Sequence, residues 1–273
     1  MNDAKPERLT YGAYLSVAQL TSLQNPLAQP SVRGEMFFII GQQVQELWFK
    51  QILYDLTEFI RLADSGYLYE AVRLLDRVNR IVSVLAQETE LLQTLPPSEF
   101  KAFRPILSTA SGFESEQFRA LEWVSGLRDA NAKRLLLHLN GGAGIMARWP
   151  RSLRDVLCGN VTSLDGDPVS AIEFLYNGTI HRPELLALVD ALSEYEIRFA
   201  EWRFHHIKVV ERVIGNRAPG TGGSSGSGYL GRTLEYRFFP ELWEARNRIS
   251  AATTPAVPAA EALALDKLTR NLQ

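Results

Sequence analysis

The sequence has a single cysteine, only four histidines and no long uninterrupted apolar run. Cys158 therefore cannot form a disulfide within the chain, and no basic N-terminal stretch is followed by the apolar run of about 7–15 residues that marks a secretory signal. Gln, Glu, Lys or Arg interrupt every apolar run before the roughly 20 residues that a membrane-spanning helix needs. We therefore expect a soluble, cytoplasmic protein that has no membrane partner.

An excess of charge of one sign is also missing, because 31 acidic and 29 basic residues give a net charge of -2. No concentrated Lys/Arg face is present that would follow a phosphate backbone, so we expect no nucleic acid partner. Sustained period-two alternation, which is typical of half-buried strands, is hard to find anywhere. With 273 residues, 46% of them hydrophobic, the chain can bury a sizeable core, and no clear linker separates two cores.

Apolar residues recur instead at spacings of three and four, which predicts an all-α fold. We expect long helices over about 35–61, 69–95 and 183–214, a short one over 98–103, and another from about 113 that ends before Gly126. Segment 138–183 is rich in Gly, Asn and Asp, and there we expect only small helices and loops. The first long helix is expected to be largely buried through one apolar stripe, made of Ile40, Val44, Leu47, Leu56 and Phe59.

Two histidines lie together near the end of the last long helix. At about 100° per residue, His206 falls in line with Trp202 and Val210, whereas His205 is rotated off this apolar stripe. A neutral imidazole on an apolar wall suits the axial position of a heme iron. The pattern alone favours a core histidine that is hydrogen-bonded to a neighbour, because one histidine without metal-ligand spacing is a weak signal.

Other candidate binding groups are spread along the chain. Arg119 lies among residues expected to be buried, and its planar fork suits a ligand carboxylate, although an ion pair with Glu122 is an equal alternative. Phe38 and Gln42 are four residues apart and share one helix face, where ordinary packing is the favoured interpretation. The Gly/Ser loop 220–226 could approach a ligand closely or be a flexible surface loop, and it matches no phosphate-binding motif.

Seven short motifs occur along the chain: residues 9–15 (LTYGAYL), 35–40 (EMFFII), 46–50 (ELWFK), 111–119 (SGFESEQFR), 202–206 (WRFHH), 220–226 (GTGGSSG) and 238–242 (FFPEL). In these motifs and in their order, the chain resembles the tryptophan 2,3-dioxygenase family. The matches cover roughly residues 9–126 and 183–245, whereas the middle stretch matches poorly and looks shorter than in typical members.

The resemblance implies a single helical heme-binding domain over 31–250 that holds heme b, with His206 as the proximal iron ligand. It implies that Arg119 holds the carboxylate of tryptophan or an analogue, that Thr221 fixes its amino-acid end and that Phe38 packs on the indole. Ser111, Gly112 and Gly222 would lie beside the heme.

The resemblance also implies a homotetramer. In it, the N-terminal segment 1–30 would reach into a neighbouring subunit, where Tyr11 and Tyr14 would complete the pocket. Ordinary helix packing is the alternative for Tyr14. Residues 251–273 form an Ala/Pro-rich tail outside the helical domain.

Gln42, the candidate catalytic residue, departs from the family pattern, which usually has a distal histidine at this position; Arg33-Gly34 likewise replaces the usual His-Asp. A glutamine forms hydrogen bonds but cannot transfer protons as a base near neutral pH. The family's reaction with O2 opens the indole ring at C2–C3 to give N-formylkynurenine. The alternatives are a heme monooxygenase that forms a 2-oxindole from tryptophan or β-methyltryptophan, a non-catalytic heme-binding protein, and a helical interaction protein.

Overall fold

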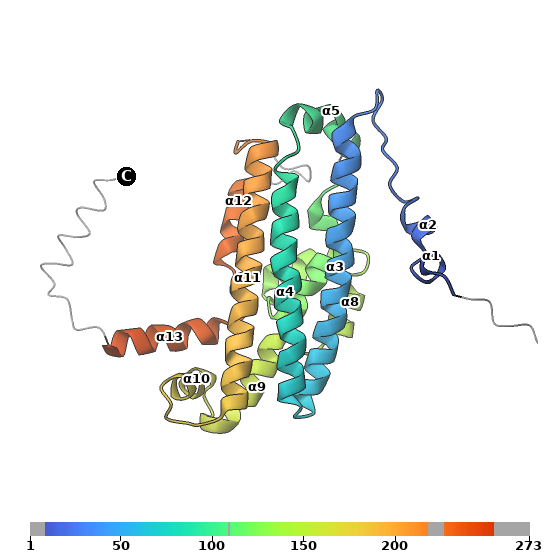
Figure 1. Cartoon of the computed structure of the whole chain (residues 1–273). Helices are drawn as coiled ribbons and strands as arrows, with labels where there is room; N and C mark the ends of the chain where they lie inside the picture. Colours follow the sequence, from blue (N-terminus) through green and yellow to red (C-terminus); the bar gives the residue numbers. More distant parts are fainter. Residues whose placement is uncertain (1–8, 109, 218–226, 254–273) are drawn as a thin grey trace, which may run out of the picture.

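The computed structural model describes residues 9–108, 110–217 and 227–253, and every regular element in these ranges is a helix. This confirms the expected all-α fold. Three long helices, α3 (Arg33–Asp64), α4 (Leu68–Leu92) and α11 (Pro183–Val213), lie side by side with α4 in the middle (Figure 1). Helix α4 packs against both of its neighbours, and Asn79 on α4 donates a hydrogen bond to the carbonyl of Ala191 on α11 at 3.1 Å.

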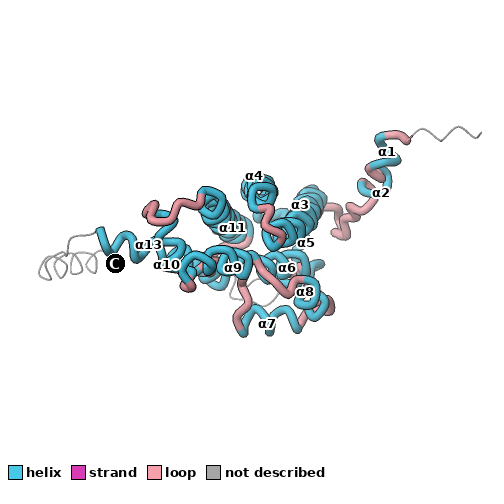
Figure 2. Tube along the Cα trace, turned by 90° about the horizontal axis from the view of Figure 1, so that it is seen from below, coloured by secondary structure: helices cyan, strands magenta, loops and turns pink. Residues whose placement is uncertain are grey.

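A second layer of shorter helices covers one side of this row, as the view along the bundle in Figure 2 shows. Helices α6 and α9 contact α3, and α9 also contacts α11. The short elements are α5 (Pro97–Leu107), η1 (Gly112–Glu114), α6 (Glu116–Ser125), α7 (Ala130–Leu137), α8 (Gly142–Arg148), α9 (Leu153–Asp165), α10 (Pro168–Tyr176), α12 (Ser227–Arg232), η2 (Thr233–Glu235) and α13 (Pro240–Thr253).

A buried carboxylate on α11 fixes the chain that follows α12. Glu196 accepts hydrogen bonds from the backbone N–H of Phe238 at 2.6 Å and from Nε1 of Trp243 at 2.7 Å. Burial raises the pKa of Glu196 above the ordinary range, and these two hydrogen bonds oppose that rise. The segment that returns from the far end of the molecule is thereby held against the middle of α11.

The expectation for segment 138–183, small helices joined by loops, is confirmed, because α8, α9 and α10 are 7, 13 and 9 residues long and loops connect them. Helix α9 begins with a reciprocal capping box, in which Ser152 and Asp155 satisfy each other's backbone N–H groups. Its residues Leu153, Val156 and Leu157 are fully buried. Tertiary packing therefore stabilises helices whose apolar patterns are short.

We expected one continuous buried stripe along α3, and this expectation was wrong for the N-terminal half of the helix. Ile40 is 45% and Leu47 is 50% exposed, whereas Leu56 and Phe59 are fully buried as expected. The buried face of the N-terminal half carries Gln45 instead, because this part of α3 turns a polar face toward a cavity.

The N-terminal helices α1 (Tyr11–Tyr14) and α2 (Val17–Leu20) lie away from the bundle (Figure 1). Neither contains a buried residue, and Tyr11 and Tyr14 are 78% and 72% exposed. The connection to α3 is fixed by Glu35, which accepts hydrogen bonds from the backbone N–H groups of Leu27 and Ala28. None of the described helices combines the length and apolar content required to cross a bilayer.

Glu88 lies on the side of α4 that contacts α3 and provides a test of how stability depends on pH. Its Oε1 accepts a hydrogen bond from Nε1 of Trp48 at 3.1 Å, and its buried Oε2 has no protein partner. Burial raises the pKa of Glu88, so the folded state binds this proton more tightly than the unfolded state, and stability is lost as the pH rises through the folded-state pKa.

We therefore expect Glu88→Gln to raise the free energy of unfolding by about 1 kcal/mol at pH 7.5 but not at pH 4. The new amide oxygen can still accept the hydrogen bond from Trp48, while the uncompensated charge is gone. Denaturant unfolding at both pH values measures the difference. The exposed Glu90→Gln serves as control and should change neither value. A loss of stability in Glu88→Gln at pH 7.5 would contradict the prediction.

Candidate active site

A cavity of about 460 Å³ lies between α3, α5, α6 and α11, closed on one side by η1, α12 and η2. This is a usual size for a pocket that binds a small molecule. Most of the wall is aromatic and aliphatic, and a few polar groups project into it. The apolar wall residues are Phe38, Phe49, Leu92, Leu95, Phe100, Leu107, Phe113, Phe118, Trp202, Val209, Val210, Val213, Ile214 and Leu230.

Six of the residues singled out from the sequence lie on the wall of this one cavity: Phe38, Gln42, Ser111, Gly112, Arg119 and His206. They come from three separate parts of the sequence: α3, the adjacent elements η1 and α6, and α11. Thr221 and Gly222 lie outside the described residues. Tyr11 and Tyr14 do not line the cavity of their own chain, because α1 lies away from the bundle.

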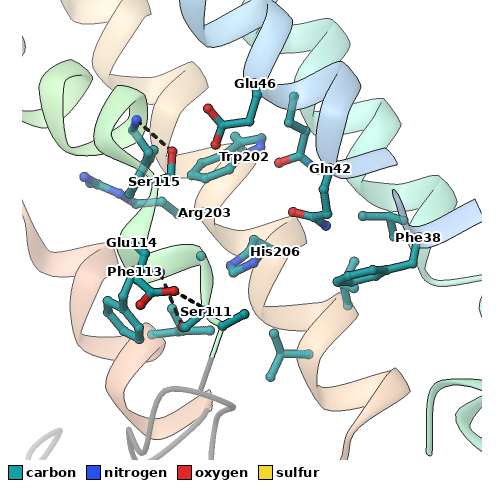
Figure 3. Close-up of a pocket in the computed structure, with 18 of the residues that line it drawn as sticks. Phe38, Gln42, Glu46, Ser111, Phe113, Glu114, Ser115, Trp202, Arg203 and His206 are labelled. Carbon is teal, nitrogen blue, oxygen red and sulfur yellow. Dashed lines mark hydrogen bonds between the residues drawn. The ribbon is translucent and has the colours of Figure 1, made fainter. Parts of the chain in front are cut away.

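His206 is on the side of α11 that faces the cavity (Figure 3). Its ring stacks on Trp202 with a centroid distance of 5.7 Å and an interplanar angle of 11°, and within the described part of the chain neither ring nitrogen forms a hydrogen bond. Burial lowers the pKa of His206 to about 4, so the imidazole is neutral at physiological pH. It can therefore offer a nitrogen lone pair to a ligand. His205 contacts Phe204 instead and does not line the cavity.

The facing wall is one side of α3, where Phe38, Gln42, Gln45 and Glu46 follow one another at helical spacing. Phe38 is packed against Phe100 and Phe103, with centroid distances of 5.7 and 5.5 Å, so its ring is fixed as a flat wall. Glu46 accepts a hydrogen bond from Nε2 of Gln117 at 2.8 Å. Among the described residues, the side-chain amides of Gln42 and Gln45 have no hydrogen-bond partner, so both are free to bond to a ligand.

The loop before α6 supplies the third wall. Ser111 caps η1, since its Oγ accepts a hydrogen bond from Phe113 N–H at 3.4 Å and its own N–H donates to Glu114 Oε2 at 3.1 Å (Figure 3). Ser115 then caps α6 through the N–H of Phe118 at 3.1 Å. These successive caps fix where α6 begins, and with it the position of Arg119 one turn later.

Arg119 is buried in α6 and forms the ion pair with Glu122 that was one of its two expected roles. Its Nη1 donates to Oε2 of Glu122 at 2.7 Å, and its guanidinium lies 4.6 Å from the centroid of the Phe118 ring. Its Nη2 has no hydrogen bond within the described residues and is not a buried atom, so it is open to the cavity. The ion pair with Glu122 therefore leaves part of the guanidinium available to a ligand.

Arg203 is a wall residue that the sequence argument did not single out. It is buried on α11, and its Nη2 donates to Oε1 of Glu122 at 3.2 Å. A signal was present in the sequence, because Arg203 follows Phe199 by four residues and precedes His206 by three, which places a charge in the apolar stripe. The partner of that charge could not be found from spacing, because Glu122 is 81 residues away.

These features define an all-helical protein with an apolar small-molecule cavity, in which a neutral histidine and a buried arginine reach the same space. Residues 1–137 and 167–249 match the family model of tryptophan 2,3-dioxygenase. The chain is 36% identical over 264 residues to a tryptophan 2,3-dioxygenase of Bacillus cereus, covering 89% of this chain and 94% of that protein. It is 34% identical over 262 residues to one of Caulobacter vibrioides, covering 88% and 98%.

The chain therefore belongs to the tryptophan 2,3-dioxygenase family, which is a family of oxidoreductases. This confirms the resemblance found in the sequence motifs. The family model omits residues 138–166, which contain α8 and α9. This agrees with the poor match of the middle stretch, although the poorly matching stretch was expected to extend further, to residue 183.

Proposed function

We propose that this protein is a heme-dependent oxygenase that acts on the indole C2–C3 bond of tryptophan or a substituted tryptophan. One observation carries the proposal: in a chain of this family, the neutral imidazole of His206 faces an apolar cavity and forms no hydrogen bond with any described residue. A single neutral histidine is the protein ligand that a heme iron requires on its proximal side.

The residues around His206 fit a heme. Val209, Val210 and Val213 extend the wall along α11 beside the imidazole and give a flat macrocycle an apolar surface. Ser111 and Gly112 would lie along its edge, and Gly222 would join them from the loop 220–226. When bound, heme b held by His206 would supply the activation of O2.

The remaining wall groups suit an indole amino acid. Arg119 would bind the substrate carboxylate through its open Nη2, and the fixed ring of Phe38 would pack on the indole. Thr221 would fix the amino-acid end. The free amide of Gln42 would form a hydrogen bond with the substrate on the side of the cavity that faces His206. By holding the substrate in an apolar space, these residues orient it and exclude water.

Insertion of both oxygen atoms, with ring opening to N-formylkynurenine, is the outcome that membership of the family favours. Gln42 motivates the second candidate, a monooxygenase that forms a 2-oxindole, because an amide cannot move a proton as a histidine can. In that case one oxygen atom enters C2 and the other leaves as water, which requires two electrons from an added reductant.

Mass spectrometry of products formed from tryptophan and β-methyltryptophan under ¹⁸O2 separates these outcomes. We expect a ring-opened product that carries two labelled atoms. A product with one labelled atom and an intact ring would reject the dioxygenase and support the monooxygenase. A heme-loaded, reduced protein that turns over neither compound would support a non-catalytic heme protein, although an amino-acid clamp such as Arg119 has no purpose in a gas sensor.

We also propose that the protein assembles as a homotetramer and that a second copy covers the N-terminal helices. Tyr11 and Tyr14 are large, exposed and unable to reach their own cavity, whereas in a neighbouring subunit they could complete the pocket. Light scattering of the heme-loaded protein should give four times the monomer mass of 30.7 kDa. A monomer that is fully active would reject the shared pocket.

A further inference from the structure

Three buried charged side chains form a linear ion-pair group, the Arg119–Glu122–Arg203 triad, beside the cavity. Glu122 receives Nη1 of Arg119 on one carboxylate oxygen at 2.7 Å and Nη2 of Arg203 on the other at 3.2 Å. The three residues are 9%, 6% and 5% exposed, and all three line the cavity. The triad therefore combines two positive charges and one negative charge in a space of low polarity.

This charge count leaves one positive charge without a partner. A buried charge is costly unless it is paired, so the triad is most stable when one anionic group contacts it. The two other carboxylates on the cavity wall, Glu46 and Glu114, accept hydrogen bonds from Gln117 and from the N–H of Ser111 and take no part in the triad. The Nε atoms of both arginines are buried and have no hydrogen-bond partner in the described part of the chain, so the described residues satisfy neither guanidinium fully. The open Nη2 of Arg119 is the point at which an anion would be received.

Arg203 is placed to influence this anion without receiving it. Its Nη2 is used by Glu122 and its Nη1 donates to the carbonyl of Thr233 at 3.3 Å. Its guanidinium is also packed against the rings of Phe199 and Phe238, with distances of 5.5 and 5.1 Å to their centroids. These contacts hold Arg203 in place, so it acts on a ligand through Glu122.

We propose that Arg203 is a positioning residue that determines the affinity of the cavity for a carboxylate, because it shares Glu122 with Arg119 and so keeps Arg119 from being neutralised. Without Arg203, the Arg119–Glu122 pair has no net charge and attracts an anion weakly. This inference deepens the proposed function and rests on it. The carboxylate is that of the amino-acid substrate or that of a heme propionate, and binding measurements distinguish the two.

The test measures the ratio of the dissociation constants of two ligands that differ by a carboxylate. On the heme-loaded protein, tryptophan is compared with tryptamine, which lacks the carboxylate, through the change of the Soret band on titration. Heme is compared with its dimethyl ester in the same way on the heme-free protein. Each ratio isolates the carboxylate, because the rest of the ligand is common to both members of the pair.

We expect Arg203→Met to reduce one of these preferences for the carboxylate by about 10- to 100-fold, the effect of one unit charge a few ångströms away in a protein interior. A loss in the tryptophan ratio identifies the substrate, and a loss in the heme ratio identifies a propionate. Glu122→Gln adds a positive charge to the triad and should increase the same preference. The double variant Glu122→Gln/Arg203→Met restores a net charge of one and should return the ratio to within about threefold of the original.

A purely structural role predicts a different result. It would weaken both members of a pair alike, and the second substitution would not rescue the first. Arg198→Met on the same helix is the matched control, since within the described residues Arg198 forms ion pairs with Glu194 and Glu201 and does not line the cavity. If Arg203→Met does not fold, the Glu122→Gln variant tests the inference by itself. An increased preference for the carboxylate supports the inference, and an unchanged or decreased preference overturns it.

The inference would be overturned if Arg203→Met changed neither the tryptophan ratio nor the heme ratio, or if the double variant did not recover the original ratio. The proposed heme-dependent function would stand in either case. A wild-type protein that binds neither heme nor tryptophan would show instead that the proposed function itself is wrong.

Discussion

When the His206→Ala variant is mixed with one equivalent of heme, we expect it to lack the Soret band of a histidine-ligated heme. The imidazole is the only neutral and unpartnered ring nitrogen among the described cavity residues, and its neighbours on α11, Trp202, Val209 and Val210, cannot ligate iron in its place. Absorption titration measures the loss directly. Added imidazole should restore part of the band in the variant, because the truncated side chain leaves space beside Trp202.

His205→Ala is the matched control, because His205 is the neighbouring residue on the same helix and does not line the cavity. It should bind heme like the unaltered protein. If His206→Ala retains an unchanged Soret band, or if His205→Ala loses it, the assignment of the proximal ligand is wrong. Circular dichroism of both variants checks that the helices of the heme-free proteins are intact.

The long helices could be predicted from sequence because periodicity is averaged over many turns. Helices α3, α4 and α11 extend over 25–32 residues, and Pro183 at the first turn of α11 and the Pro96-Pro97 pair beyond α4 indicate their ends. Helix α9 has 13 residues and a weaker pattern, yet its capping box at Ser152 and Asp155 was a local signal for its start. A search for caps, and not only for periodicity, would have found it.

The exposure of Ile40 and Leu47 could not be predicted in the same way. Periodicity identifies an apolar face, but which elements cover that face depends on tertiary packing. In α3 the N-terminal half contacts α4 at Gly41 and Trp48 and provides the cavity wall with Gln42 and Gln45, and neither contact covers Ile40 or Leu47. The apolar side chains on the other side of this half remain open to solvent or to another subunit.

The sequence indicated individual residues of the candidate site, but it did not show how these residues are arranged in space. The sequence could place Phe38 and Gln42 on one face and His206 on another, and the motif order indicated that they belong together. The Glu122–Arg203 ion pair joins residues that are far apart in the sequence and follows no local rule. The excess positive charge of the Arg119–Glu122–Arg203 triad, which depends on that pair, could therefore be recognised only from the folded chain.

Arg119→Met is expected to lower kcat/KM for tryptophan by about 100- to 1,000-fold, equivalent to about 3–4 kcal/mol for the charge-assisted hydrogen bonds to the substrate carboxylate. The substitution removes the open Nη2 and also leaves Glu122 paired one to one with Arg203, so the triad loses both its donor and its excess positive charge. Arg119→Lys keeps the charge without the planar fork and should recover only part of the loss.

Steady-state kinetics with tryptophan and tryptamine, which lacks the carboxylate, gives the decisive comparison for Arg119. If Arg119 binds the carboxylate, Arg119→Met should change kcat/KM for tryptamine much less than for tryptophan. Equal losses for both compounds would mean that Arg119 mainly supports α6 through Glu122 and Phe118. Because Arg119 and Arg203 act on the same charge, the loss in the Arg119→Met/Arg203→Met double variant should fall short of the sum of the two single losses.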